Sequence, residues 1–265
     1  AVLTVGTGGS PGREGPTRQI GAGLGSILSQ LLRLGDRERR ILVVSGAAAG
    51  TGAILVTTLG AALYAVEVLY RDDFETDALV PSILASVTAY SIFTTLVGPG
   101  PLFTTAEAYP FHALELPFFG VMALGLALFG TVFVRIDRGL ETRVFGRVPL
   151  PKWARPALGG LLLGLLGVVV PQAMGTGYGW AQGAILGDDW VPLGLSGAGL
   201  LLAFAAAKML ATGLTIGSGG SGGHLGPMLV IGALVGGGFG QLFHQVAPTI
   251  VADPGAYALV GMGAF

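Results

Sequence analysis

The sequence contains no cysteine and few charged side chains. Only 11% of its 265 residues are Asp, Glu, Lys or Arg. The missing cysteines exclude disulfide bonds and thiolate metal sites. Average soluble domains carry about 25% charged residues, so this chain has too few to cover the surface of a soluble protein. With 52% hydrophobic residues and a mean hydropathy of +0.73, the composition predicts an integral, multi-pass membrane protein.

The patterns that mark enzymes and nucleic-acid-binding proteins are also missing. The formal net charge of −1 gives no sign of nucleic-acid binding. His112 and His244 are isolated and give no metal-ligand spacing. Gly217–Gly222 fits the letters Gly-x-Gly-x-x-Gly, but it follows an apolar helix rather than a strand, which disfavours a dinucleotide site. We therefore predict no enzyme activity, no catalytic residues, no metal and no cofactor.

What the chain does contain is a Gly-rich phrase that occurs twice. Leu3–Leu31 and Leu214–Leu242 align without gaps at an offset of 211 and share about half of 29 positions. So long a match indicates a structural repeat. In each copy a Gly-rich segment leads into Gly-Pro and an apolar stretch. Proline suits the first turn of a helix, so each copy predicts an irregular segment that leads into a helix N-terminus.

These two helix starts predict an anion pathway. Irregular backbone at membrane depth is tolerated only where it is buried in protein or lines an aqueous cavity. A helix that begins there directs unpaired N–H groups and its positive dipole end inward, which attracts anions. Transporters with a mid-membrane site use two repeats in this way.

The remaining helices are predicted from apolar stretches separated by charged or Gly/Pro-rich ones. We expect membrane spans over Pro81–Val97, Leu116–Ile136 and Pro192–Thr212. Shorter helices are expected over Pro16–Arg33, Pro156–Val170 and Pro227–Val246, two within Ile41–Tyr70, and one that starts at Tyr257. Loops are expected over Gly35–Arg40, Gly98–Pro110, Asp137–Arg155 and Gly175–Gly187. The positive-inside rule would place Arg33–Arg40 and Arg135–Arg155 in the cytoplasm, but the uncertain number of crossings leaves the orientation open. The abrupt first and last residues suggest a fragment that lacks both ends.

Two motifs carry a family resemblance. Gly12-Arg13-Glu14-Gly15-Pro16 follows GTGGSP, and Gly222–Pro227 occupies the matching place in the second copy. Together with Gly46–Gly50, Ala65–Val68 and Ala207–Lys208, they resemble the CLC (voltage-gated chloride channel) family of prokaryotic type. The resemblance implies an all-α inverted-repeat bundle with short, broken and re-entrant helices, forming a single, partial transmembrane domain over residues 1–265. It also implies a homodimer in a cell membrane, with one anion pathway in each subunit.

The resemblance further implies selective passage of chloride and similar small anions. Chloride would be held by the main-chain amides of two triplets, Arg13, Glu14 and Gly15 in the first copy and His224, Leu225 and Gly226 in the second. The Glu14 carboxylate would act as the gate, since a carboxylate at a helix N-terminus is an internal anion that competes with chloride. Its protonation would release the site. The alternative is that Glu14 only stabilises the helix start.

Several features depart from the family pattern. A coordinating Ser and a coordinating Tyr of the family lie outside these residues, so a non-conducting structural or regulatory fragment is an alternative. His224 replaces an aliphatic residue and is either a packed neutral side chain or a titrating group. Glu67 matches a position on the proton path, or is an interfacial charge at a helix end. Proton-coupled members carry a second acid at the position of Val68, so valine favours passive conduction, with a proton-coupled chloride antiporter as the alternative. Lys208 within an apolar span is either functional or paired with a carbonyl.

Overall fold

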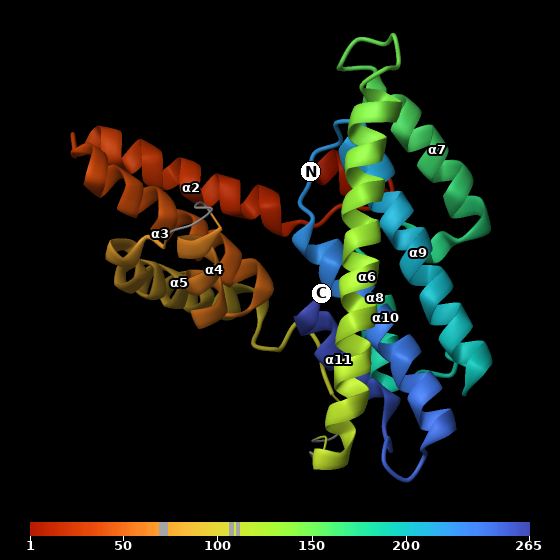
Figure 1. The fold of residues 1–265 in the computed structure, drawn as a ribbon. Coiled ribbons are helices and arrows are strands. Elements are labelled where there is room, and N and C mark those ends of the chain that lie inside the picture. The colour runs from red at the N-terminus through yellow and green to blue at the C-terminus, as the bar shows by residue number, and fades with distance from the viewer. Residues whose placement is uncertain (69–73, 106–108, 110–111) are drawn as a thin grey trace. The chain divides into compact units, whose positions relative to one another are not determined.

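The computed structural model describes residues 1–68, 74–105, 109 and 112–265, and these are almost entirely helical (Figure 1). Within these ranges the only extended pairing is a single bridge between Gly12 and Gly223. The prediction of an all-α fold is confirmed. The chain forms two compact units, one of Arg13–Phe103 and the other of Ala1–Gly12 with Thr104–Phe265.

The unit of residues 13–103 is a bundle of four helices around α3. Its helices are α2 (Glu14–Leu31), α3 (Asp36–Leu55), α4 (Leu59–Glu67) and α5 (Thr76–Val97). Helix α3 contacts the other three. The centre is made of small and aliphatic side chains: Val44, Ala47, Ala48, Ala65, Val66 and Ala78. Such small side chains let helices approach closely, as is usual where lipid provides no hydrophobic driving force.

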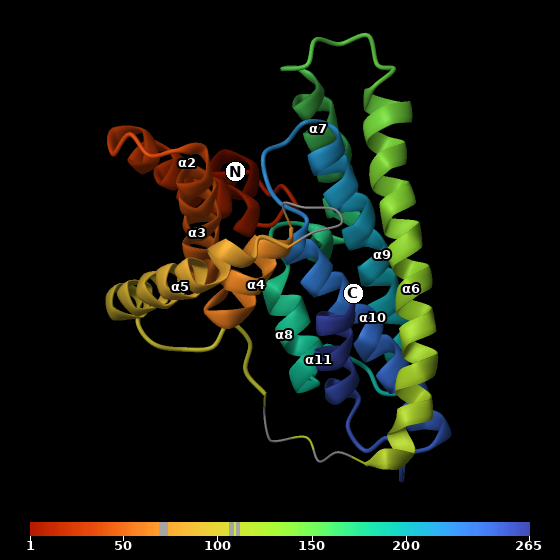
Figure 2. The same ribbon diagram turned by 60° about the vertical axis from the view of Figure 1, so that its left-hand side comes forward.

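Glycines set the distance between α2 and α3, which lie side by side in Figures 1 and 2. A Cβ added to Gly21 would overlap the carbonyl oxygen of Gly46, and one added to Gly25 would overlap that of Leu42. The two backbones therefore touch at these points. Only glycine fits at either position without moving the helices apart.

The expected break within Ile41–Tyr70 is present. Helix α3 ends at Leu55 with Val56 in the left-handed region (φ 56°), and α4 begins three residues later. The last two residues of that range lie outside the described residues. A β-branched residue rarely adopts this conformation, so the break is imposed by the packing of α3 and α4 rather than by local preference.

The loop predicted over Gly35–Arg40 is wrong. Gly35 is extended, and Asp36 already begins α3, so the charged residues form its first turns. Asp36 and Glu38 lie in the first turn, where their negative charges are favoured by the positive end of the helix dipole. Helix α5 likewise begins before the predicted start, with Pro81 in its interior. Residues 106–108 and 110 of the predicted loop Gly98–Pro110 lie outside the described residues.

The second unit packs its helices around α10. It contains α1 (Val2–Gly6), α6 (Leu116–Gly139), α7 (Arg155–Val169), α8 (Tyr178–Leu186), α9 (Leu195–Gly217), α10 (Leu225–Val246) and α11 (Pro254–Ala264), with short turns η1 (Ala113–Glu115), η2 (Leu140–Phe145) and η3 (Pro171–Ala173). In the most apolar 18-residue stretch of α10, 72% of the residues are buried. In the corresponding stretch of Ala113–Phe145, which contains α6, only 17% are buried. Helix α10 is therefore the core, and α6 runs along the outer side of this unit (Figure 2).

Two predicted loops of this unit contain helices. The range Gly175–Gly187 contains α8, which lies between two left-handed glycines, Gly177 (φ 82°) and Gly187 (φ 68°). The range Asp137–Arg155 begins inside α6, which continues through the π-helical turn η2 to Phe145. A loop was predicted there because clustered charged residues are typical of turns at a membrane surface. Charged residues are also compatible with a helix that extends past the apolar segment, as α6 and η2 do. The helices predicted over Pro156–Val170 and Pro227–Val246 are confirmed as α7 and α10.

We expect Gly21→Ala to destabilise the unit of residues 13–103 by about 1–3 kcal/mol, because its methyl group would force α2 away from α3. Gly23→Ala is the matched control, since an added Cβ there meets no atom within 4 Å. Alanine also favours the helix by up to about 1 kcal/mol, so this control should not lose stability. Unfolding in SDS followed by circular dichroism measures both. Equal effects of the two substitutions would contradict the glycine contact.

Candidate functional site

The two Gly-rich phrases meet at the Gly12–Gly223 bridge. The Gly12 amide donates to the Gly223 carbonyl at 2.7 Å, and the Gly223 amide donates back at 2.9 Å. A Cβ added to the neighbouring Gly222 would overlap Pro11. Helix α2 begins two residues after Gly12, and α10 begins two residues after Gly223. The bridge thus fixes the chain directly before both predicted site triplets.

The offset of 211 seen in the sequence recurs in the hydrogen bonds. The Gly9 amide donates to the Thr4 carbonyl at 2.8 Å, and the Gly220 amide donates to the Thr215 carbonyl at 2.9 Å. The glycine that precedes each donor is left-handed, with φ of 90° in the first phrase and 100° in the second. Both phrases therefore turn the chain between two helices by the same backbone geometry.

Helix contacts repeat at the same offset. Gly232 and Gly236 of α10 lie 211 residues after Gly21 and Gly25 of α2. A Cβ at either position would overlap a carbonyl oxygen of α11, that of Gly261 or Tyr257. In both copies, therefore, the helix that follows the Gly-rich segment contacts the next helix along the chain. The contact is made by two glycines that lie four residues apart.

Buried hydroxyl groups attach the first phrase to α9. The Ser10 amide donates to Thr215 Oγ1 at 3.1 Å, and Thr212 Oγ1 donates to the Ser10 carbonyl at 3.0 Å. All three side chains are buried. These bonds hold the backbone before the bridge without using a charged group.

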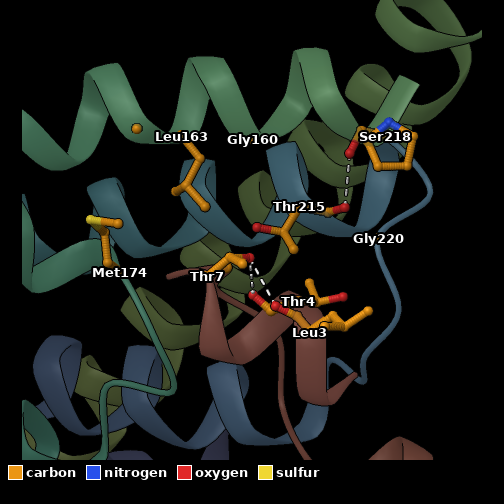
Figure 3. Close-up of a pocket in the computed structure, with 12 residues that line it drawn as sticks. Leu3, Thr4, Thr7, Gly160, Leu163, Met174, Thr215, Ser218 and Gly220 are labelled. Carbon is orange, nitrogen blue, oxygen red and sulfur yellow. Dashed lines mark hydrogen bonds between the residues drawn. The ribbon is translucent and has the colours of Figure 1, made fainter. Parts of the chain in front are cut away.

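A pocket of about 270 Å³ lies beside these turns, between α1, α7 and the end of α9 (Figure 3). Its hydroxyls are turned back to the backbone: Thr7 Oγ1 donates to the Leu3 carbonyl at 2.8 Å, and Ser218 Oγ donates to the Thr215 carbonyl at 3.0 Å. No charged side chain lines it among the described residues. The hydroxyls of Thr7, Thr215 and Ser218 thus already donate to carbonyls, and with no cation in its lining this pocket does not favour an anion.

The first predicted triplet forms the N-terminus of α2. Arg13 is the N-cap residue, and Glu14 is the first residue of the helix. The Glu14 side chain is only 2% exposed. Thr17 Oγ1 closes the first turn by donating to the Glu14 carbonyl at 2.9 Å. A buried acid therefore stands at the positive end of a helix.

The second predicted triplet forms the N-terminus of α10. His224 is the N-cap residue, and its carbonyl accepts from the Met228 amide at 2.9 Å. Leu225 begins the helix and Gly226 is buried. No acid is present in this first turn. The helix start therefore offers amides without a competing carboxylate in its own sequence.

His224 has a partner that the sequence did not reveal. Its Nε2 lies 3.2 Å from Asp137 Oδ2, and its ring stands edge-on to Phe133 with centroids 6.2 Å apart. Asp137 is carried by α6, in a stretch predicted as a loop. The neighbouring Asp137 carboxylate raises the pKa of His224 above its ordinary value of 6.5 against the opposing effect of burial, and Glu141 acts in the same direction as Asp137. His224 therefore has a carboxylate beside its ring as well as the aromatic contact with Phe133.

Lys208 and Glu67 have different surroundings. Lys208 is fully buried, and its Nζ donates to the carbonyl of Gly175 at 2.6 Å, in the segment before α8. The alternative of carbonyl pairing is thus the one observed. Glu67 is the last residue of α4 and is exposed, as is Val68 after it.

The described residues contain four helices long and apolar enough to cross a membrane, and a glycine bridge joins the segments before two helix starts. These features define an integral, multi-pass membrane protein. The model of the voltage gated chloride channel family matches residues 1–265, and the chain belongs to this family.

Similar proteins support the same assignment. An uncharacterized protein of Methanocaldococcus jannaschii is 31% identical over 95% of this chain and 61% of its own length. A protein of Ralstonia nicotianae named "Putative chloride channel protein ClcB-like" is 33% identical over 100% of this chain and 60% of its own. The chain thus spans about three fifths of the length of these relatives.

Two solved structures share the fold. A slow cyanobacterial Cl⁻/H⁺ antiporter superposes with a TM-score of 0.81 at 26% identity, over 98% of this chain and 60% of that one. A CLC-type fluoride/proton antiporter superposes with a TM-score of 0.73 at 24% identity, over 97% of this chain and 69% of that one. The helical architecture expected from the sequence is confirmed by both.

We expect the His224–Asp137 pair to stabilise the protein below about pH 6.5 and to lose this effect as pH rises through the raised pKa of His224. Asp137→Asn should therefore cost stability at pH 5.5 and little at pH 8.5. The cost should stay below about 1 kcal/mol, since the pair is partly exposed. Thermal unfolding at both pH values measures it.

Asp77→Asn is the matched control for this experiment. Asp77 pairs with Arg37 at 2.6 Å. The ordinary pKa values of aspartate and arginine side chains lie outside the range from pH 5.5 to 8.5. Its cost should not change with pH. An Asp137→Asn cost that is equally independent of pH would contradict the titration of His224.

Proposed function

We propose that this protein allows chloride and similar small anions to cross a membrane. The proposal assigns anion binding to the main-chain amides of Arg13, Glu14 and Gly15 at the start of α2, and of His224, Leu225 and Gly226 at the start of α10. Helix N-termini favour anions through the direction of their N–H groups and the positive end of the helix dipole, without a buried cation. Membership of the voltage gated chloride channel family supports this assignment.

The observation that carries the proposal is the burial of Glu14 as the first residue of α2. A buried carboxylate at this place occupies the same electropositive position that a chloride ion would take. When it is ionised, it competes with the anion. When it is protonated, the competition ends, so passage of anions increases as pH falls.

We further propose that conduction is passive. Val68 cannot carry a proton, and it follows Glu67 at the position where the family resemblance implies a second acid in most proton-coupled members. A proton-coupled antiporter is the second candidate, because both solved structures that share the fold are described as proton antiporters. In that case Glu67 would take part in the proton path.

The proposed unit of function is a homodimer in a lipid bilayer, in which each subunit carries its own pathway. Because the chain spans about three fifths of its relatives, a non-conducting structural or regulatory segment is a third possibility. Flux measured on residues 1–265 alone and on the complete protein with any flanking sequence separates these possibilities.

Glu14→Gln should abolish the pH dependence of chloride flux and raise the flux near neutral pH, because the amide carries no charge and cannot be protonated. Chloride efflux from liposomes containing the complete protein, measured with an electrode at about pH 5 and about pH 8, tests this. Glu38→Gln, an exposed acid of α3, is the control and should behave as the wild type. An unchanged pH profile in Glu14→Gln would remove the gate assignment.

A chloride gradient should not drive protons uphill through the wild-type protein. The measurement is the internal pH of liposomes loaded with a pH-sensitive dye, under an outward chloride gradient and with the membrane potential clamped. Proton uptake against its gradient would overturn passive conduction. Its loss in Glu67→Gln would then place Glu67 on the proton path.

A further inference from the structure

Three arginines line a hollow on the outer helix of the second unit. The hollow has a volume of about 370 Å³ and is formed by Val134, Arg135, Arg138, Gly139, Thr142 and Arg143 of α6 and η2. Gly139 leaves the space at its centre, since an added Cβ there would meet no atom within 4 Å. We call this hollow the arginine groove. It belongs to neither predicted triplet.

The guanidinium groups of the groove are available for a ligand. Arg135, Arg138 and Arg143 are exposed and form no ion pair or side-chain hydrogen bond with any described residue. The hydroxyl of Thr142 donates to the Arg138 carbonyl at 2.6 Å. The arginines therefore supply the free donors of the groove. Of the nearby acids, Asp137 is paired with His224.

The position of the groove along its helix indicates its depth in a membrane. Leu116–Val134 contains 19 residues without a charge. At 1.5 Å per residue they extend about 28 Å, close to the roughly 30 Å of a hydrocarbon core. Arg135 and Arg138 follow at once, so they fall in the headgroup layer. This layer adds about 5–8 Å on each side.

The surroundings of the groove have the same character. Residues 135–155 contain six basic side chains and two acidic ones. Trp153, in the loop after η2, is 83% exposed. Exposed tryptophan and clustered basic residues are typical of the membrane–water interface, where basic clusters attract anionic lipids.

We propose that the arginine groove binds the phosphate group of an anionic phospholipid. The planar guanidinium group of arginine can donate two parallel hydrogen bonds to phosphate oxygens. Three arginines around one hollow therefore favour a lipid headgroup with a net negative charge over a zwitterionic headgroup. Binding there would fix the position of the outer helix in the bilayer.

The test is lipid binding to the purified complete protein, counted by native mass spectrometry during titration with phosphatidylglycerol or phosphatidylcholine. The wild type should prefer phosphatidylglycerol. The triple variant Arg135→Gln, Arg138→Gln, Arg143→Gln should bind phosphatidylglycerol on the order of 100-fold more weakly, because each basic residue near an anionic surface contributes about fivefold. Gly139→Leu keeps every charge but fills the hollow, and it should also lose the preference.

The matched control removes the same charge elsewhere. Arg33, Arg39 and Arg40 are exposed in the other unit and form no ion pair among the described residues. Their triple Gln variant should bind phosphatidylglycerol as the wild type does. Equal loss in both triple variants, or unchanged binding in the groove variant, would overturn the proposal. Displacement of the lipid by millimolar inorganic phosphate would also overturn it, since the groove would then recognise the free ion. The triple Lys variant at positions 135, 138 and 143 keeps the charges and tests the fork geometry, with intermediate binding expected.

Discussion

The second unit depends on two hydrogen bonds between backbones that carry no side chain at the point of contact. Gly12 and Gly223 exchange amide and carbonyl groups at 2.7 and 2.9 Å. Irregular backbone within a membrane protein must satisfy its polar groups internally, because lipid offers no partner. The bridge satisfies one donor and one acceptor from each phrase. It also holds the chain two residues before the start of α2 and of α10.

The same constraint explains why so many residues are glycine. Within lipid, helices are not driven together by the hydrophobic effect, so contact between backbones has to supply the packing energy. Gly21 and Gly46 allow this between α2 and α3, and Gly232 and Gly261 allow it between α10 and α11. Where the backbone is irregular, buried polar side chains add support, as Thr215 does by accepting from the Ser10 amide.

The sequence predicted the parts of the structure that depend on local residue pattern. The repeat at an offset of 211 and the two helix starts beside Gly-Pro follow from the placement of Gly and Pro. The break before α4 was also expected, but in the structure it depends on the packing of α3 and α4. It failed at Gly35–Arg40, where charged residues form the first turns of α3. It also failed in the first part of Asp137–Arg155, where the helix continues through η2 to Phe145. It also could not find the partner of His224, because the pairing with Asp137 depends on how α6 packs beside α10.

The two copies show how one backbone design can support different chemistry. Glu14 and Leu225 occupy equivalent positions at the offset of 211, as do Arg13 and His224. The amides at a helix start bind anions whatever side chains they carry. The side chains are therefore free to differ without loss of the binding geometry. In the first copy this freedom places a buried acid at the helix start. In the second copy, His224 lies beside Asp137 of α6, so its acidic partner belongs to a helix outside the repeat. In the proposed site, a backbone that supplies the donors thus leaves the control by pH to the side chains.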